Sequence, residues 1–352
     1  MNLTSFYPGP SQLYPQVEGY LQDAYRSGIL SMNHRSGSFM DMLAKTVADM
    51  HVKLDIPTDY EVYFTSSATE CWEIVSQSLV QNRSLHAYNG AFGQKWFEYA
   101  SRLHPASGHA FGPEEDLNLE GGDHVKSAEV LCLTHNETSN GTALPARTLH
   151  KIRQEFKGII AVDATSSMAG VALPWSAGDV WFASVQKCFG LPPGLGVLVV
   201  SPRAIERAET IGERDHYNSL LFLRDNFVKN QTPYTPNTLG IYLLGRVLEE
   251  VPPIADTALN IARRAQAFCQ FLNENSYKIL IKNPEVRSPT VLTIEADENF
   301  IKQLKEKARE AGILLGTGYG AWKATTFRIA NFPAISDLSF AQLQDFLEKS
   351  RL

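Results

Sequence analysis

Short apolar runs alternate with helical patterns through the first two thirds of the chain. The apolar runs predict strands, and hydrophobic residues spaced three and four apart between them predict helices. Strands are expected at 61–65, 86–88, 129–134, 158–163 and in the two apolar runs on either side of Lys187, with helices at 15–25, 39–54, 71–81, within 90–101, and at 144–156. Strands that alternate with helices in this way predict a doubly wound α/β domain with a mostly parallel sheet.

The pattern changes after Pro202. Residues 204–212 and 239–251 have helical periodicity, whereas the polar and aromatic stretch 215–230 predicts an irregular segment. A long helix at about 255–275 is expected to lead into a second, smaller α+β domain, with strands at 291–294 and 326–330 and helices at 298–311 and 339–349. The predicted organisation is an N-terminal arm (1–14) that joins the small domain, a large ligand-binding domain (15–253) and a small C-terminal domain (254–352).

Composition and charge narrow the class of protein. The net charge of −6 leaves no excess of Lys and Arg to neutralise phosphates, so a nucleic-acid or membrane-surface binder is not expected. The four cysteines contain no CxxC pair, which speaks against a disulfide framework and a structural zinc site. No apolar run approaches the ~18 residues that a membrane span needs, and no signal peptide is evident. A protein of the cytoplasm is therefore expected, acting on small molecules, without a metal.

Two charged side chains end predicted buried strands. Lys187 follows the run 179–185, and Asp163 closes the run 158–162. Burial disfavours both charges, so each placement is costly unless the charged group is paired with another charge or takes part in chemistry. Taken singly, a surface lysine and an N-capping or ion-paired aspartate are the more common explanations. A desolvated lysine is also a nucleophile toward carbonyls, and a buried carboxylate can keep a heterocyclic nitrogen protonated.

Three further segments stand at strand ends, where ligands bind in α/β sheets. Ser67-Ala68-Thr69 opens a helix, and its free N–H groups suit either simple capping or a phosphate. Phe92 lies between small residues and is suited to core packing or to stacking on a planar ligand. The polar stretch 136–141 either makes a turn or faces the ligand.

The order and spacing of these features resemble the fold-type I, class V family of pyridoxal-phosphate (PLP)-dependent aminotransferases, and within it the phosphoserine aminotransferases. The resemblance covers nearly the whole chain and implies a large, mostly parallel sheet between helices, with a smaller α+β C-terminal domain. Its more specific segments are 6–10, 34–36, Asn136-Glu137-Thr138, Asp163 with Ser166-Ser167, Gln186-Lys187 with the turn that follows, Thr232-Pro233, and Arg328.

The resemblance implies a role for each matching residue. Lys187 would hold the cofactor as a Schiff base and carry a proton during transamination, and Asp163 would hold the pyridinium proton. Phe92 would stack on the ring and Thr138 would support its phenolic edge. The cofactor phosphate would be bound by Ala68, Thr69 and Gln186, and by Thr232 from a second subunit, which implies a homodimer with shared active sites.

For the substrate, the resemblance matches Arg328 to the arginine that binds the α-carboxylate, and His34 and Arg35 to a pair that holds a phosphate. A surface ion pair is the alternative explanation of Arg328. At two places, one for the substrate phosphate and one for the cofactor phosphate, this chain departs from the typical family sequence. Ala321-Trp322-Lys323 stands where a His-Arg pair is typical, and Thr69 stands where an arginine is common. Lys323 could supply a cation, but it fits a phosphate less well than a guanidinium does.

Four functions are compatible with these residues. A phosphoserine:2-oxoglutarate aminotransferase of serine biosynthesis, which converts 3-phosphohydroxypyruvate and glutamate to phosphoserine and 2-oxoglutarate, is favoured by His34 and Arg35. An alanine- or serine–glyoxylate-type aminotransferase is favoured by the missing His-Arg pair. A cysteine desulfurase needs a reactive cysteine on a late loop, whereas the last cysteine, Cys269, lies in a predicted helix. A non-catalytic binding protein is disfavoured by Lys187 and Asp163.

Overall fold

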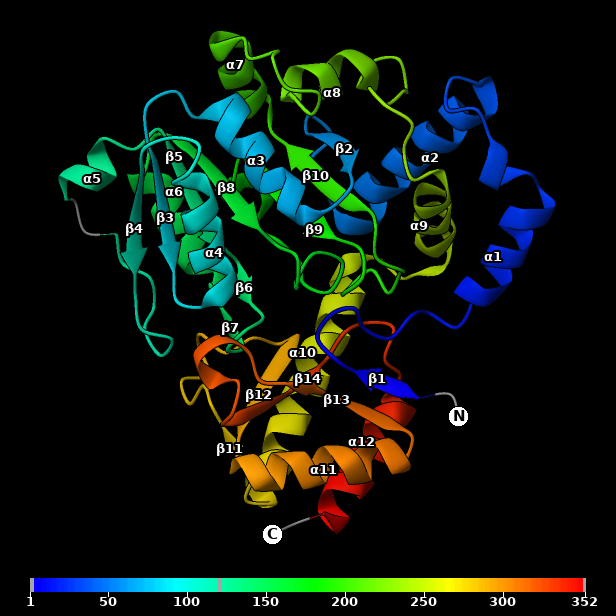
Figure 1. The fold of residues 1–352 in the computed structure, drawn as a ribbon, viewed down its shortest axis with the longest axis vertical. Helices are drawn as coiled ribbons and strands as arrows, with labels where there is room; N and C mark the ends of the chain where they lie inside the picture. Colours follow the sequence, from blue (N-terminus) through cyan, green and yellow to red (C-terminus); the bar gives the residue numbers. More distant parts are fainter. Residues whose placement is uncertain (1–2, 120–121, 351–352) are drawn as a thin grey trace.

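The computed structural model describes residues 3–119 and 122–350 and divides into a large upper and a small lower part (Figure 1). The large part is built on a seven-stranded sheet with the order β2-β10-β9-β8-β5-β3-β4. Its strands are β2 (Glu61–Thr65), β3 (Ser84–Tyr88), β4 (Ala106–Ala110), β5 (Val130–Thr134), β8 (Ile159–Asp163), β9 (Val180–Ser184) and β10 (Gly196–Val200). A two-stranded hairpin, β6 (Asn136–Glu137) and β7 (Thr142–Ala143), extends from it.

The centre of the large sheet is buried on both faces. Every residue of β8, β9 and β10 is buried, which explains why these strands are almost continuously apolar. Neighbouring strands from β9 to β4 are parallel, whereas β10 runs antiparallel to both β9 and β2. The predicted α/β architecture with a mostly parallel sheet is confirmed.

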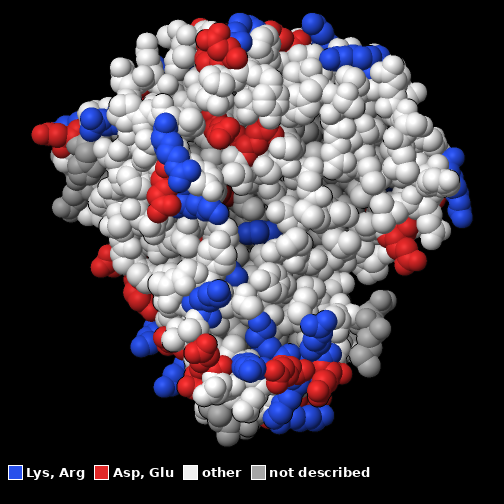
Figure 2. All heavy atoms as spheres, in the orientation of Figure 1, with Lys and Arg blue, Asp and Glu red and all other residues white. Residues whose placement is uncertain are grey.

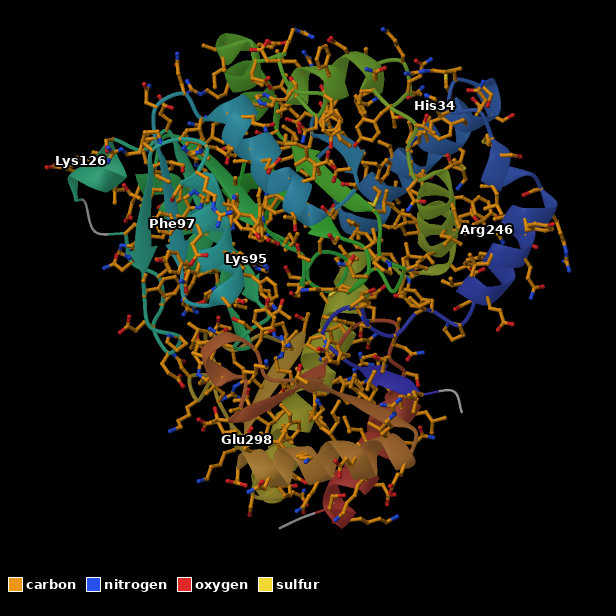
Figure 3. The ribbon with its side chains drawn as sticks, in the orientation of Figure 1. His34, Lys95, Phe97, Lys126, Arg246 and Glu298 are labelled. Carbon is orange, nitrogen blue, oxygen red and sulfur yellow. The ribbon has the colours of Figure 1, made fainter. Side chains whose placement is uncertain are left out.

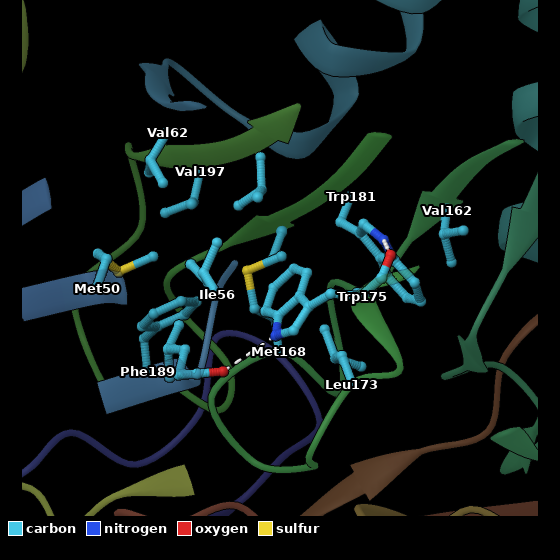
Figure 4. Packing of buried hydrophobic residues seen from close by; sticks show 14 of the residues in the cluster. Met50, Ile56, Val62, Val162, Met168, Leu173, Trp175, Trp181, Phe189 and Val197 are labelled. Atoms are coloured by element: carbon cyan, nitrogen blue, oxygen red, sulfur yellow. Dashed lines mark hydrogen bonds between the residues drawn. The ribbon is translucent and has the colours of Figure 1, made fainter. Parts of the chain in front are cut away.

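Helices cover both faces of this sheet. They are α1 (Val17–Arg26), α2 (Gly37–Leu54), α3 (Ala68–Leu79), α4 (Ala91–Ala100), α5 (Asp123–Lys126), α6 (Ala146–Glu155), α7 (Pro202–Ile211), α8 (Leu220–Phe227) and α9 (Thr238–Glu250), with 3₁₀ turns at Ile29–Ser31 and Trp175–Ala177. On the face covered by α2, Trp175 and Trp181 pack among aliphatic side chains and methionines (Figure 4). Trp181 donates to the carbonyl of Trp175 at 3.2 Å, and Trp175 donates to the carbonyl of Leu54 at 3.1 Å. These bonds satisfy both buried indole N–H groups inside the core.

The small part has its own sheet, with the order β1-β13-β14-β12-β11. Its elements are β1 (Thr4–Phe6), α10 (Ile254–Glu274), β11 (Lys278–Ile279), β12 (Val291–Glu295), α11 (Glu298–Glu310), β13 (Ile313–Thr317), a 3₁₀ turn at Gly320–Trp322, β14 (Thr326–Ala330) and α12 (Asp337–Lys349). The N-terminal arm contributes β1, which pairs in parallel with β13. Residues 4–6 therefore lie beside residues 313–315, and the arm that follows β1 passes between the two parts.

The structure corrects the prediction for residues 215–230. This stretch was expected to be irregular, but it contains α8, whose residues Leu220, Leu221 and Leu223 are buried. The helix has only two turns, so its apolar face is too short to show a period in the sequence. The strands β4 and β13 were also not predicted. β4 has the sequence ASGHA, which lacks the large apolar residues typical of strands.

Surface charge is mixed. On the face in Figure 2, Lys and Arg intermingle with Asp and Glu over the small part, while wide areas of the large part carry neither. Within the described residues, no helix is long and apolar enough to cross a membrane. No group of three or more His, Cys, Asp or Glu side chains in residues 3–119 and 122–350 is arranged to hold a metal ion.

Candidate active site

A cavity of about 290 Å³ lies where the ends of β8 and β9 meet the small part. Its volume is close to the lower end of the range for small-molecule sites. Figure 3 labels Lys95 on α4, one of the helices that border it. Its walls come from both parts and from the arm: Tyr7, Pro8, Gly9, Ala68, Thr69, Trp72, Phe92, Lys95, Tyr99, Thr134, Asn136, Thr138, Asp163, Thr165, Ser166, Ser184, Gln186, Lys187, Tyr319 and Arg328.

Lys187 lies at the base of this cavity, three residues beyond the end of β9. It is 8% exposed, and its Nζ donates to Thr138 Oγ1 at 2.9 Å and to Ser166 Oγ at 3.2 Å. Burial lowers the pKa of Lys187 to about 8, although the nearby Asp163 carboxylate acts in the opposite direction. No carboxylate in the described residues forms an ion pair with it. The amine is therefore held by two hydroxyls and is partly neutral near physiological pH.

Asp163 ends β8, next to β9 in the sheet, so the predicted closeness of Asp163 and Lys187 is confirmed. Its carboxylate accepts hydrogen bonds from Trp72 Nε1 at 3.1 Å and from the backbone N–H of Thr165 at 2.9 Å. Burial raises the pKa of Asp163, and the bonds with Thr165 and the charge of Lys187 oppose that rise. The carboxylate has no ion pair among the described residues and lines the cavity.

The start of α3 forms another wall. Ser67 caps the helix, one of the two alternatives for this segment, because its Oγ accepts the backbone hydrogen bond of Glu70 at 3.1 Å. The backbone N–H of Ala68 donates to Ser184 Oγ at 2.7 Å, so it is not free for a ligand in this arrangement. Thr69 and Gln186 line the cavity beside the positive end of the helix. The positive end of a helix favours negative charge, so this wall suits an anion as well as the cap.

Two aromatic rings form the opposite wall. Phe92, in the first turn of α4, stacks on Tyr319 with ring centres 4.9 Å apart and an interplanar angle of 19°. The Nζ of Lys187 lies 5.3 Å from the centre of the Phe92 ring. The ring therefore faces the cavity and the lysine.

Arg328, in the middle of β14, is 3% exposed, so the interpretation as a surface ion pair is wrong. Its Nε donates to the carbonyl of Thr317 at 2.6 Å and its Nη1 to the carbonyl of Thr138 at 2.7 Å. No carboxylate in the described residues pairs with it. Burial lowers the pKa of Arg328, which stays positively charged because guanidinium pKa values are so high. These contacts fix the guanidinium while leaving donors for a ligand.

Three predicted site residues do not line the cavity of their own chain. Arg35 is exposed, and its Nη1 donates to Gln231 Oε1 at 2.6 Å. His34 lies near Phe39 on the outer side of the large part, where Figure 3 labels it. Thr232 is buried, and its hydroxyl donates to the carbonyl of Tyr234 at 2.7 Å. Lys323 is exposed and also lies outside the cavity wall.

Other cavity residues were not predicted. From the arm, Gly9 lies so close to Lys187 that a Cβ built on it would be 2.8 Å from Lys187 Cε. The Tyr7 hydroxyl lies within hydrogen-bonding distance of Thr317 Oγ1, at 3.1 Å. Tyr319 comes from the loop after β13, and the run Gly316-Thr317-Gly318-Tyr319-Gly320 could have indicated a close approach of backbone to a ligand.

Residues 122–332 match the family model described as aminotransferase class-V, which covers more than half of the chain. The chain belongs to this family. The predicted family and the predicted fold-type I aminotransferase architecture are thereby confirmed. This class V aminotransferase is also similar to solved structures over almost its whole length.

A crystal structure of a phosphoserine aminotransferase from Cytophaga hutchinsonii is 32% identical, with a TM-score of 0.93 and 99% of each chain covered. The curated phosphoserine aminotransferases of Rhodococcus opacus (strain B4) and Corynebacterium glutamicum (strain R) are 26% and 27% identical, covering 95% of this chain and 91% of theirs. An aspartate aminotransferase from Thermus thermophilus shares the fold at 22% identity, with a TM-score of 0.86 and 98% of each chain covered.

Proposed function

We propose that this class V aminotransferase uses PLP to transfer an amino group from glutamate to 3-phosphohydroxypyruvate, giving phosphoserine and 2-oxoglutarate. The observation that carries the proposal is the placement of Lys187, Asp163 and Arg328 around one cavity. Relatives named as phosphoserine aminotransferases match the chain over 94–95% of its length, which supports this choice of substrate.

The donors and acceptors of the cavity fit PLP. It offers an amine for an aldehyde, a carboxylate for a pyridine nitrogen, and the positive end of a helix for a phosphate. Three buried polar atoms of its wall have no hydrogen-bond partner among the described residues: Thr134 Oγ1, Asn136 Nδ2 and Thr165 Oγ1. Because buried polar groups are rarely left unpaired, they indicate that the cavity is built for a polar ligand. When bound, PLP supplies an electron-accepting ring next to its reactive carbon.

The roles proposed for the protein follow from these positions. Lys187 holds the cofactor and then moves a proton to and from the substrate Cα, for which a pKa near 8 is suited. Asp163 keeps the ring nitrogen protonated. Phe92 stacks on the ring, and Thr138 donates to its phenolic oxygen. Thr69 and Gln186 would hold the cofactor phosphate, and Ala68 would join them once its backbone N–H exchanges Ser184 Oγ for the phosphate.

A homodimer completes the proposed site. Thr232 of a second subunit would reach the cofactor phosphate, because the hydroxyl of the same chain lies outside the cavity. His34 and Arg35 would bind the substrate phosphate, while Arg328 would bind its α-carboxylate through the donors left free by Thr317 and Thr138. The proposed location is the cytoplasm.

One observation favours a second candidate, an alanine- or serine–glyoxylate-type aminotransferase. Lys323 is exposed and does not line the cavity, so it gives no cation to a substrate phosphate in this arrangement. Rapid mixing of the PLP-loaded enzyme with phosphoserine, alanine, serine or glutamate separates the two candidates. We expect the largest kcat/KM for phosphoserine and glutamate, measured from the change in cofactor absorbance. A preference for alanine over phosphoserine would reject the first candidate.

A further inference from the structure

Glu137 is a buried carboxylate beside the cavity, and no role has been assigned to it above. It is 1% exposed, and it precedes Thr138, whose hydroxyl receives the hydrogen bond from Lys187. No Lys, Arg or His in the described residues forms an ion pair with it. An isolated buried carboxylate is costly, so its hydrogen bonds must compensate for the lost solvation.

The carboxylate receives four hydrogen bonds. Oε2 accepts from the backbone N–H groups of Phe92 and Gly93, both at 3.1 Å. Oε1 accepts from the backbone N–H of Ser139 at 2.9 Å and from its hydroxyl at 2.6 Å. Three of the partners are backbone N–H groups, which can only donate, and the Ser139 hydroxyl can donate as well, so these contacts favour the ionised form. Burial raises the pKa of Glu137, and these bonds oppose that rise.

The same bonds complete the start of α4. The first N–H groups of a helix have no partner within the helix. Here Ala91 N–H donates to Ser139 Oγ at 3.0 Å, while Phe92 and Gly93 donate to Glu137. All three donors of the first turn are thus held by residues 137–139. Gly90 allows this approach, because a Cβ at that position would lie 2.3 Å from Glu137 Cγ.

We propose that Glu137 is a positioning residue that fixes the Phe92 ring against the cofactor and holds Thr138 in register with Lys187. The inference rests on the proposed function. The side chains of Glu137 and Thr138 have different partners: Glu137 binds the start of α4, and Thr138 binds Lys187. A single short segment therefore ties the stacking ring to the reactive amine. The negative charge of Glu137 also favours the positive forms of Lys187 and Arg328.

The test compares Glu137→Gln with Ser139→Ala and with Asp179→Asn. The glutamine keeps the shape but turns an NH₂ group toward backbone N–H donors, which breaks at least one of the four bonds. Ser139→Ala is a milder change that keeps the carboxylate and removes the hydroxyl. Asp179 controls for the loss of a buried carboxylate elsewhere in the large part. It accepts a backbone N–H from Ile160 at 2.8 Å and also pairs with Arg153 at 2.7 Å, and it precedes β9, at the opposite end from Lys187.

The first measurement is amide hydrogen exchange of the cofactor-free protein. We expect Glu137→Gln to lose protection at Ala91, Phe92 and Gly93 by at least about tenfold, Ser139→Ala to lose less, and Asp179→Asn to leave these amides unchanged. If Glu137→Gln does not fold, Ser139→Ala alone must show the loss at Ala91. Unchanged protection at the start of α4 in either folded variant of this pair would overturn the proposal.

The second measurement is the pH titration of the absorbance of bound PLP. Lys187 is faced by Asp163 from the end of β8, Arg328 from β14, Glu137 from β6 and the adjacent Cys188. We expect Glu137→Gln to shift the titration to lower pH and to reduce kcat by about 10- to 100-fold, with Asp179→Asn unaffected in both. Equal effects of Asp179→Asn would reduce the role of Glu137 to general stability and overturn the proposal. If the wild-type enzyme showed no transamination with the four substrates, the proposed function would fail, but the exchange result would still decide the role of Glu137.

Discussion

Replacing Lys187 by methionine should stabilise the cofactor-free protein, and the gain should shrink as the pH rises. Burial lowers the pKa of Lys187 from 10.5 to about 8 in the folded protein. Between these two values the unfolded chain binds a proton that the folded chain has released. The free energy of unfolding of the wild type therefore rises with pH in this window. Methionine has a similar length and no charge, so the variant lacks this dependence.

The size of the effect follows from the shift. Each pKa unit corresponds to about 1.4 kcal/mol. The lysine thus costs the folded wild type about 3 kcal/mol at pH 7 and about 1 kcal/mol at pH 9.5. The difference in unfolding free energy between Lys187→Met and wild type should fall by about 2 kcal/mol across this range. Because Lys187 is 8% exposed, screening by solvent is small at this position.

Urea unfolding of both proteins without cofactor, at several pH values from 7 to 9.5, measures this difference directly. The titration of other groups is common to both proteins and largely cancels. Lys126→Met is the control for the loss of a lysine side chain, since Lys126 is exposed at the outer edge of the large part (Figure 3). A Lys187→Met difference that stays constant with pH would refute the reasoning that burial depresses this pKa.

Two further predictions concern other residues of the cavity. Arg328→Lys keeps the positive charge but loses the planar guanidinium, so KM for amino-acid and 2-oxo-acid substrates should rise by about 10- to 100-fold in steady-state kinetics. The affinity for PLP, measured by cofactor titration, should change little. Unchanged KM values would contradict the carboxylate role of Arg328. Gly9→Ala should destabilise the protein by about 1–3 kcal/mol in thermal unfolding, because Gly9 has a φ of +138° and the new Cβ would contact Lys187 too closely. An unchanged Tm in this variant would show that the arm can move aside.

The fold of the large domain could be predicted from the sequence because its central strands are buried on both faces. Continuous apolar runs such as β8 and β9 leave no other interpretation when helical patterns separate them. Two of the elements that were missed, β1 and β4, have weaker local signals. β4 lacks large apolar residues, and β1 is a three-residue strand whose stability comes from pairing with β13, which is distant in sequence. Long-range pairing of this kind leaves no pattern within the strand itself.

The candidate site was predictable where a residue ends a buried strand. Asp163 and Lys187 were identified because a charged group after an apolar run is costly, and this cost is a local feature of the sequence. The walls formed by Gly9 and Tyr319 were not identified. They come from the arm and from the loop after β13, and only the packing of the two parts brings them to the cavity. Glu137 was named only as part of a motif, since its hydrogen bonds to α4 depend on the tertiary fold.

The predicted residues that lie outside the cavity share one feature that bears on the proposed dimer. Arg35 and Thr232 come from segments almost 200 positions apart, yet Arg35 donates to Gln231, the neighbour of Thr232. The two segments are therefore joined in one region of the large part, and neither Arg35 nor Thr232 lines the cavity of its own chain. Residues with unrelated roles would not be expected to lie together in this way. Their association supports the proposal that a second copy receives them as a unit, with Thr232 directed to the cofactor phosphate and Arg35 to the substrate phosphate of the neighbouring cavity.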